Sequence, residues 1–242
     1  MSDNITRYAT TGNRQLSPQI WANCPRAQIL TGHLDRGWGF IDDFLELPTG
    51  RWTATQASAG TFALDDAKGG VALADCNSTT TTQGINVQRN STVGEMFNCQ
   101  YGKVYFEALV KTADVATGPE GFIGLSVIDT TIIATSALSA QSIGFFTLTD
   151  NNVWLSGTKD GSSAATGTGH TFVEDTWVKV GFVVTKDDKV EFYVDGVLVN
   201  TETTYIPTTE MTVSFVCQSA GTTDPILHID WVACFQAENL ER

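Results

Sequence analysis

Residues 188–202 read DKVEFYVDGVLVNTE, two short runs of alternating character joined by Asp195-Gly196. In the first run Val190, Phe192 and Val194 alternate with charged or amphipathic residues, which is typical of a strand with one buried face. An Asp-Gly pair supplies the positive φ angles that a two-residue hairpin turn requires. This stretch therefore predicts a β-hairpin.

The same alternation recurs elsewhere. Residues 176–186 read TWVKVGFVVTK, and in residues 226–235, ILHIDWVACF, strict alternation would put one set of side chains on one face: Leu227, Ile229, Trp231 and Phe235. Helix is nearly absent from the pattern, with a turn or two conceivable only in residues 40–47 and 131–140. Two low-complexity stretches, 78–82 and 161–169, are predicted to be exposed loops.

The composition fits one all-β domain with an extension. A chain of 242 residues can form a single sandwich core, and 42% apolar against 17% charged residues argues against disorder. The net charge of −13 argues against nucleic acid or an anionic membrane as the main partner. Five cysteines without a ligand-type spacing are predicted to be buried free thiols rather than a disulfide framework.

Residues 1–40 differ from the rest because they show no sustained period and carry a net charge of +2, against −15 for residues 41–242. We expect an extended N-terminal arm over 1–40 followed by the sandwich over 41–242. Scattered apolar residues in such an arm favour docking onto a partner, and the alternative is that the arm wraps across its own sandwich. The candidates for partner binding are Arg7, Tyr8, Arg14, Ile20, Trp21 and Arg26.

The order of these segments resembles the concanavalin A-like lectin/glucanase superfamily, including laminin-G-like modules. The resemblance spans roughly residues 41–237 and rests on the strand that begins near Trp177, on FYVDGVLV at 192–199 and on IDWV at 229–232. It implies a jelly-roll β-sandwich of two antiparallel sheets. It leaves the chemistry open, because the superfamily includes lectins, glycosidases, polysaccharide lyases and purely structural domains.

Catalytic motifs of that superfamily are not recognisable. Its glucanases place paired carboxylates on one strand as E-x-D-x-x-E, and this motif is absent. The acidic pairs of this chain, such as residues 42–43 and 187–188, are sequence neighbours, which point to opposite faces of a strand. The sequence therefore predicts a protein that is not an enzyme.

Metal sites have only weak sequence signals. His228 and Asp230 stand at i and i+2, so a regular strand would project both from one face, as a metal site, an acid/base pair or a plain polar surface. No cofactor is predicted. The resemblance adds the possibility of a structural calcium ion, which many relatives hold with aspartates, and Asp42, Asp43 and Asp230 are the possible contributors.

Glycan binding would require a loop aromatic beside hydrogen-bonding side chains. The best candidate is Trp154 with Asp150 and Asn152, and the alternative is an ordinary hairpin whose tryptophan packs inward.

The layout of IDDFLEL at 41–47, KVYFEALVK at 103–111 and IDWVACFQ at 229–236 is also similar to sandwich domains in virion structural proteins of tailed phages. With no secretion signal at the N-terminus, we expect a virion protein made in the host cytoplasm. The expectation is a capsid decoration protein that binds the major capsid protein or other virion proteins through its arm, as a homo-oligomer. The alternative is a carbohydrate-binding tail appendage or fibre domain that recognises surface glycans.

Overall fold

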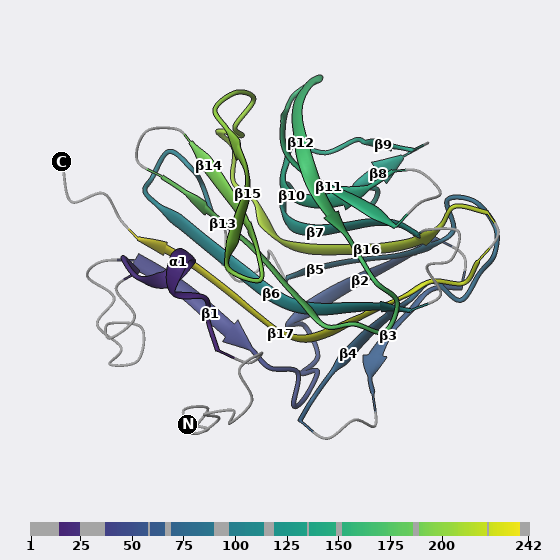
Figure 1. Cartoon of the computed structure of the whole chain (residues 1–242). Helices are drawn as coiled ribbons and strands as arrows, with labels where there is room; N and C mark the ends of the chain where they lie inside the picture. Colours follow the sequence, from purple (N-terminus) through teal and green to yellow (C-terminus); the bar gives the residue numbers. More distant parts are fainter. Residues whose placement is uncertain are drawn as a thin grey trace.

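The computed structural model describes ten stretches of the chain: residues 15–24, 37–57, 59–65, 69–89, 97–113, 119–134, 136–148, 152–185, 189–221 and 223–237. They form two large antiparallel sheets packed face to face (Figure 1). The predicted all-β sandwich is confirmed. No helix in these stretches is long and apolar enough to cross a membrane.

The first sheet, sheet A, has the order β15 (Val197–Glu202), β14 (Val190–Val194), β13 (Val178–Val184), β6 (Val104–Ala113), β17 (Ile226–Ala237), β4 (Ala72–Asp75) and β3 (Thr61–Leu64), and β1 (Gly37–Asp42) also pairs with β17. The second sheet, sheet B, has the order β12 (Ser163–Thr171), β11 (Val153–Asp160), β10 (Ser142–Thr147), β7 (Pro119–Ser126), β16 (Thr212–Ser219), β5 (Gly84–Arg89) and β2 (Trp52–Ala57). A small hairpin joins β8 (Ile133–Ala134) to β9 (Ala137–Leu138). The one described helix is α1 (Pro18–Trp21).

The predicted hairpin is present as β14 and β15. Asp195 and Gly196 adopt φ angles of 49° and 78°, as the two-residue turn requires. The alternate residues Val190, Phe192 and Val194 face the core between the sheets. Phe192 contacts Phe182 of sheet A and Phe145 of sheet B, with ring centroids 5.8 and 5.6 Å apart. The hairpin therefore joins the two layers.

The last strand, β17, departs from strict alternation. Its register against β6 shifts between Ile229 and Trp231, which makes Asp230 the extra residue of a β-bulge. Before the bulge Ile229 faces the core, whereas after it Val232 does, and Trp231 lies in a separate cluster on the outer face of sheet A. The predicted grouping of Trp231 with Ile229 is therefore wrong, because one inserted residue reverses the faces that follow.

Two other local predictions also need correction. Residues 161–169 were expected to be a loop, but most of them belong to β12, the edge strand of sheet B, in which small residues pair with β11. Residues 131–140 form the β8–β9 hairpin rather than a helical turn. All five cysteines are buried thiols outside disulfide bonds, as predicted.

Residues 15–24, here called the N-terminal segment, pack on the outer face of sheet A against β6, β13 and β17 (Figure 1). Ile20 and Trp21 are only 2% and 3% exposed and cluster with Tyr105 and Trp231. For this segment the structure thus supports the alternative in which the arm wraps across its own sandwich. Strand β1 begins at Gly37, so the last residues assigned to the arm belong to sheet A.

Candidate functional site

The outer face of sheet B, turned away from the core, is covered by the chain itself. Residues 127–141, here called the cover loop, connect β7 to β10 and contain β8 and β9; residue 135 lies outside the described residues. Ile132, Ile133 and Leu138 of this loop form an apolar cluster with Phe122 and Phe146 of sheet B. These contacts bury the middle of the sheet face, where a binding groove could otherwise open.

Two carboxamides of β5 hold the cover loop by hydrogen bonds. Gln88 Nε2 donates to the Val127 carbonyl at 3.1 Å, and Gln88 Oε1 accepts from the Asp129 amide at 3.0 Å. Asn86 Nδ2 donates to the Asp129 carbonyl at 2.6 Å. The polar side chains that face outward from sheet B are therefore used to fix a segment of the same chain.

A buried carboxylate anchors the middle of the loop, between β8 and β9. Glu120 of β7 is 1% exposed, and its two oxygens accept hydrogen bonds from Ser136 Oγ at 2.5 Å and from Gln218 Nε2 at 2.6 Å. Both oxygens are thus occupied by neutral donors of the protein. This arrangement suits a structural carboxylate more than one that exchanges protons with a substrate.

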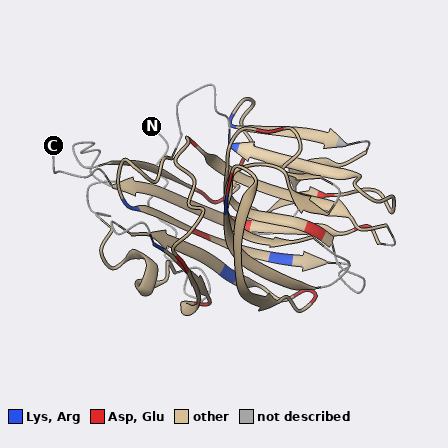
Figure 2. Cartoon of the chain, turned by 90° about the horizontal axis from the view of Figure 1, so that it is seen from above, with Lys and Arg blue, Asp and Glu red and all other residues tan. Residues whose placement is uncertain are grey.

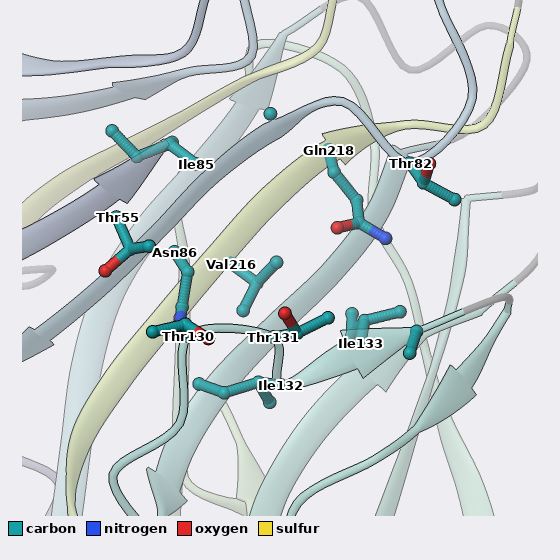
Figure 3. Close-up of a pocket in the computed structure, with 12 residues that line it drawn as sticks. Thr55, Thr82, Ile85, Asn86, Thr130, Thr131, Ile132, Ile133, Val216 and Gln218 are labelled. Atoms are coloured by element: carbon teal, nitrogen blue, oxygen red, sulfur yellow. The ribbon is translucent and has the colours of Figure 1, made fainter. Parts of the chain in front are cut away.

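Between the cover loop and the strands β2, β5 and β16 lies a pocket of about 250 Å³ (Figure 3). Its wall comprises four threonines, the carboxamides of Asn86 and Gln218, Gly84, Ala134 and four aliphatic side chains. None of these wall residues is ionisable. Figure 2 shows how sparse charged residues are on the strands in general.

A pair of catalytic carboxylates is not present on the described strands of sheet B, where the acidic residues are Glu120 and Asp160. The strand register places Asp160 beside the start of β10, which pairs with the far end of β7 from Glu120. Six residues of strand separate the two levels, about 20 Å at the usual rise. Glycosidase carboxylates stand at most about 9.5 Å apart.

The possible calcium contributors do not form a site within the described stretches. Asp42 is 4% exposed, and its Oδ2 accepts from Arg89 Nη1 at 3.1 Å and from Trp52 Nε1 at 2.9 Å. Its charge is therefore balanced by a buried arginine that links β1 to sheet B. Asp230 lies in the bulge of β17, and no three acidic, histidine or cysteine side chains of the described residues gather around a common point.

The suggested pair of His228 and Asp230 spans this bulge, so the regular alternation on which the prediction of a common face rested does not hold there. His228 is half-buried on the outer side of sheet A, with Trp177 edge-on at 6.4 Å. Burial lowers the pKa of His228, and the nearby Lys111 lowers it further. The neutral imidazole is favoured there, and within the described residues His228 belongs to no group of three possible metal ligands.

The glycan candidates at residues 150–154 are not assembled as predicted. Trp154 is 1% exposed and packs against Phe172 with ring centroids 4.9 Å apart, so its ring cannot stack on a sugar. The inward-packing alternative is correct. Asn152 Nδ2 donates to the Phe172 carbonyl at 3.2 Å, and Asp150 lies outside the described residues.

Among the arm candidates, Ile20 and Trp21 are buried against sheet A and are not exposed anchors for a partner. The others, Arg7, Tyr8, Arg14 and Arg26, lie outside the described residues. Sequence reasoning missed the residue that holds the segment in place, Glu107. This buried carboxylate of β6 accepts from the Ser17 amide at 2.9 Å and from Trp21 Nε1 at 2.8 Å. Burial raises the pKa of Glu107, although these donors oppose the shift.

Solved structures of other proteins share this architecture. The chain is similar to a β-glucanase from Bacillus licheniformis, with a TM-score of 0.58 at 16% identity over 84% of this chain and 99% of that one. It is also similar to the carbohydrate recognition domain of Emp47p, with a TM-score of 0.57 at 11% identity over 82% and 95% of the two chains. The fold is therefore a concanavalin A-like jelly-roll of the lectin and glycosidase type. At these identities the likeness concerns the fold alone.

Within that class, the family model of the SO2946-like C-terminal domain matches residues 67–230. This is more than half of the chain, which belongs to that family. A solved structure of a protein of unknown function, SO2946 from Shewanella oneidensis MR-1, has a TM-score of 0.60 at 16% identity over 90% of this chain and 96% of that one. No curated protein sequence matches the chain.

Proposed function

We propose that this protein is a non-enzymatic structural protein that serves on the outer surface of a virion. The observation that carries the proposal is the outer face of sheet B, which is filled by the cover loop and lacks a carboxylate pair on its described strands. A lectin-type sandwich closed in this way has lost the arrangement that glycoside hydrolysis needs. Its surfaces remain suited to packing against other proteins.

The setting on a virion rests on the sequence layout that resembles sandwich domains of tailed-phage virion proteins. The N-terminal segment changes the expected mode of attachment, because Ile20 and Trp21 are buried against their own sandwich and are not exposed to a partner. Attachment through the arm would therefore fall to the other predicted residues, Arg7, Tyr8, Arg14 and Arg26.

Copy number tests the structural role. Particles purified from cells that produce this protein should contain it in many copies, measured by quantitative mass spectrometry relative to the major capsid protein. Particles of full infectivity that lack the protein, with all of it left in the soluble lysate, would refute the proposal.

Activity assays test the non-enzymatic part. The purified chain should release no reducing ends from mixed-linkage β-glucan or from other common polysaccharides, because the carboxylate pair is missing. The variant Glu120→Gln serves as the control. Turnover that this substitution or a substitution of Asp160 abolishes would show that the protein is an enzyme.

A further inference from the structure

The pocket beside the cover loop has a defined hydrogen-bonding character because its two carboxamides are held in one orientation. The carboxylate of Glu120 can only accept, so the Gln218 side chain must present its Nε2 to it, at 2.6 Å. The other end of that amide, Oε1, is left as an acceptor. In Figure 3 the Gln218 side chain extends into the pocket, across from Thr131.

The orientation of the Asn86 side-chain amide is fixed in the same way. Its Nδ2 donates to the Asp129 carbonyl, which can only accept, and this leaves Oδ1 as the free end of the amide. That oxygen is buried without a hydrogen-bond partner, on a residue that is 6% exposed. Because this oxygen has almost no accessible surface, Asn86 fixes the cover loop and the shape of the wall, and the acceptor that the pocket offers is Gln218 Oε1.

The other residues of the pocket wall restrict the class of ligand that the pocket can bind. Four threonine hydroxyls can donate or accept, and the aliphatic side chains of Ile132, Ile133 and Val216 supply an apolar side, whereas the Ile85 side chain faces the core. The wall offers no cation for an anionic group and no carboxylate for a cationic one. A volume of about 250 Å³ corresponds to on the order of eight water molecules, which is room for one small ring.

We propose that this pocket binds one neutral sugar ring, with a hydroxyl of the sugar donating to Gln218 Oε1 and the C–H face of the ring against Val216 and Ile133. The sugar is either a free hexose or the terminal ring of a glycan chain. The site is separate from residues 150–154, where sequence reasoning placed glycan binding. It does not depend on the structural role proposed above, since a virion surface protein and a soluble one could both carry it.

The test uses the full chain labelled with ¹⁵N and titrated with D-glucose, D-galactose and N-acetyl-D-glucosamine. We expect at least one of them to shift the amides of Thr131 and Ala134 with a Kd in about the millimolar range, as suits a ligand of this size. Glucuronate and glucosamine should bind at least about tenfold more weakly, because the wall pairs with neither charge. Disaccharides distinguish the two sources: tighter binding indicates a glycan chain end, and equal or weaker binding a free sugar.

Variants test whether the sugar binds in the pocket or elsewhere on the outer face of sheet B. Ala134→Trp, which fills the pocket, should abolish the shifts, and Gln218→Met should weaken binding by about tenfold or more. Thr53→Val is the matched control, two residues before the pocket residue Thr55 on the same strand, and it should leave binding unchanged. Melting temperatures of all variants confirm folding. The proposal fails if none of the three sugars shifts these amides up to roughly 100 mM, far above a millimolar Kd, or if Ala134→Trp binds them as well as the native chain.

Discussion

Adjacent residues of β14 occupy different environments, and this difference is measurable. Phe192 is fully buried between the sheets, whereas Tyr193 points outward, is half-buried and donates its hydroxyl to Glu191 at 2.9 Å. Phe192→Ala should lower the free energy of unfolding by about 3–5 kcal/mol, the usual range for a large core aromatic. Tyr193→Ala should cost less than half as much in urea denaturation. Equal losses would mean that the outer side of β14 is packed as tightly as the core.

Burial of Glu107 predicts a pH dependence with a definite sign. Its folded-state pKa is raised above the ordinary value of 4.5, so between the two values the folded state binds more protons than the unfolded chain. The contribution of Glu107 to stability is therefore greatest below pH 4.5 and declines as the pH rises through the folded-state pKa. Thermal unfolding of Glu107→Gln should show a flatter pH profile than the native chain above pH 4.5.

Glu191 serves as a control because its pKa is shifted in the opposite direction. Its pKa is lowered by the hydrogen bond from Lys189. The stability that it contributes is present above the ordinary value of 4.5 and is lost as the pH falls below it. Glu191→Gln should therefore change the profile only on the acidic side. If Glu107→Gln and the native chain have parallel profiles above pH 4.5, the carboxylate of Glu107 is not held in the environment described.

At the scale of elements, the N-terminal segment is a part of the folded unit. Trp21 stacks on Tyr105 with ring centroids 5.9 Å apart and bonds Glu107, whereas Gln19 of the same helix is exposed. Trp21→Ala should cost about 3–5 kcal/mol, and Gln19→Ala less than about 0.5 kcal/mol. Chemical denaturation followed by circular dichroism measures both. A Trp21→Ala variant as stable as Gln19→Ala would restore the view of this segment as a dispensable arm.

Most strands could be predicted from the sequence, because their pattern is local. The β14–β15 hairpin needs only alternation and an Asp-Gly turn within residues 190–202. The cover loop could not be predicted, since its position depends on Gln88 and Glu120, which lie outside it and meet it only in the folded chain. Similarly, the bulge of β17 shifts the register by one residue without a glycine or proline to signal it.

At the scale of the whole molecule, the class of fold could be predicted from the order of strands, but the candidate site could not. The pocket is built from β2, β5, β16 and the cover loop, and its wall runs from Thr55 to Gln218, about two thirds of the chain. No spacing rule joins Asn86 to Gln218, since each acquires its role only when its amide nitrogen has been engaged by another segment. The burial of Trp154 and Trp21 and the direction of their side chains also could not be predicted, because neither property follows from residue type.

The central place of β17 has a consequence for how the chain folds. This strand pairs with β1, β4 and β6, and it is the last of the described strands to leave the ribosome. Sheet A can therefore not close before β17 has been made, and β1 must wait for a partner almost 200 residues downstream. Chains dominated by such distant pairings fold slowly, on the order of milliseconds to seconds. Until β17 arrives, β1, β4 and β6 have open edges that can pair with other chains, so the nascent protein has a hazard of aggregation that the pairing of β17 removes.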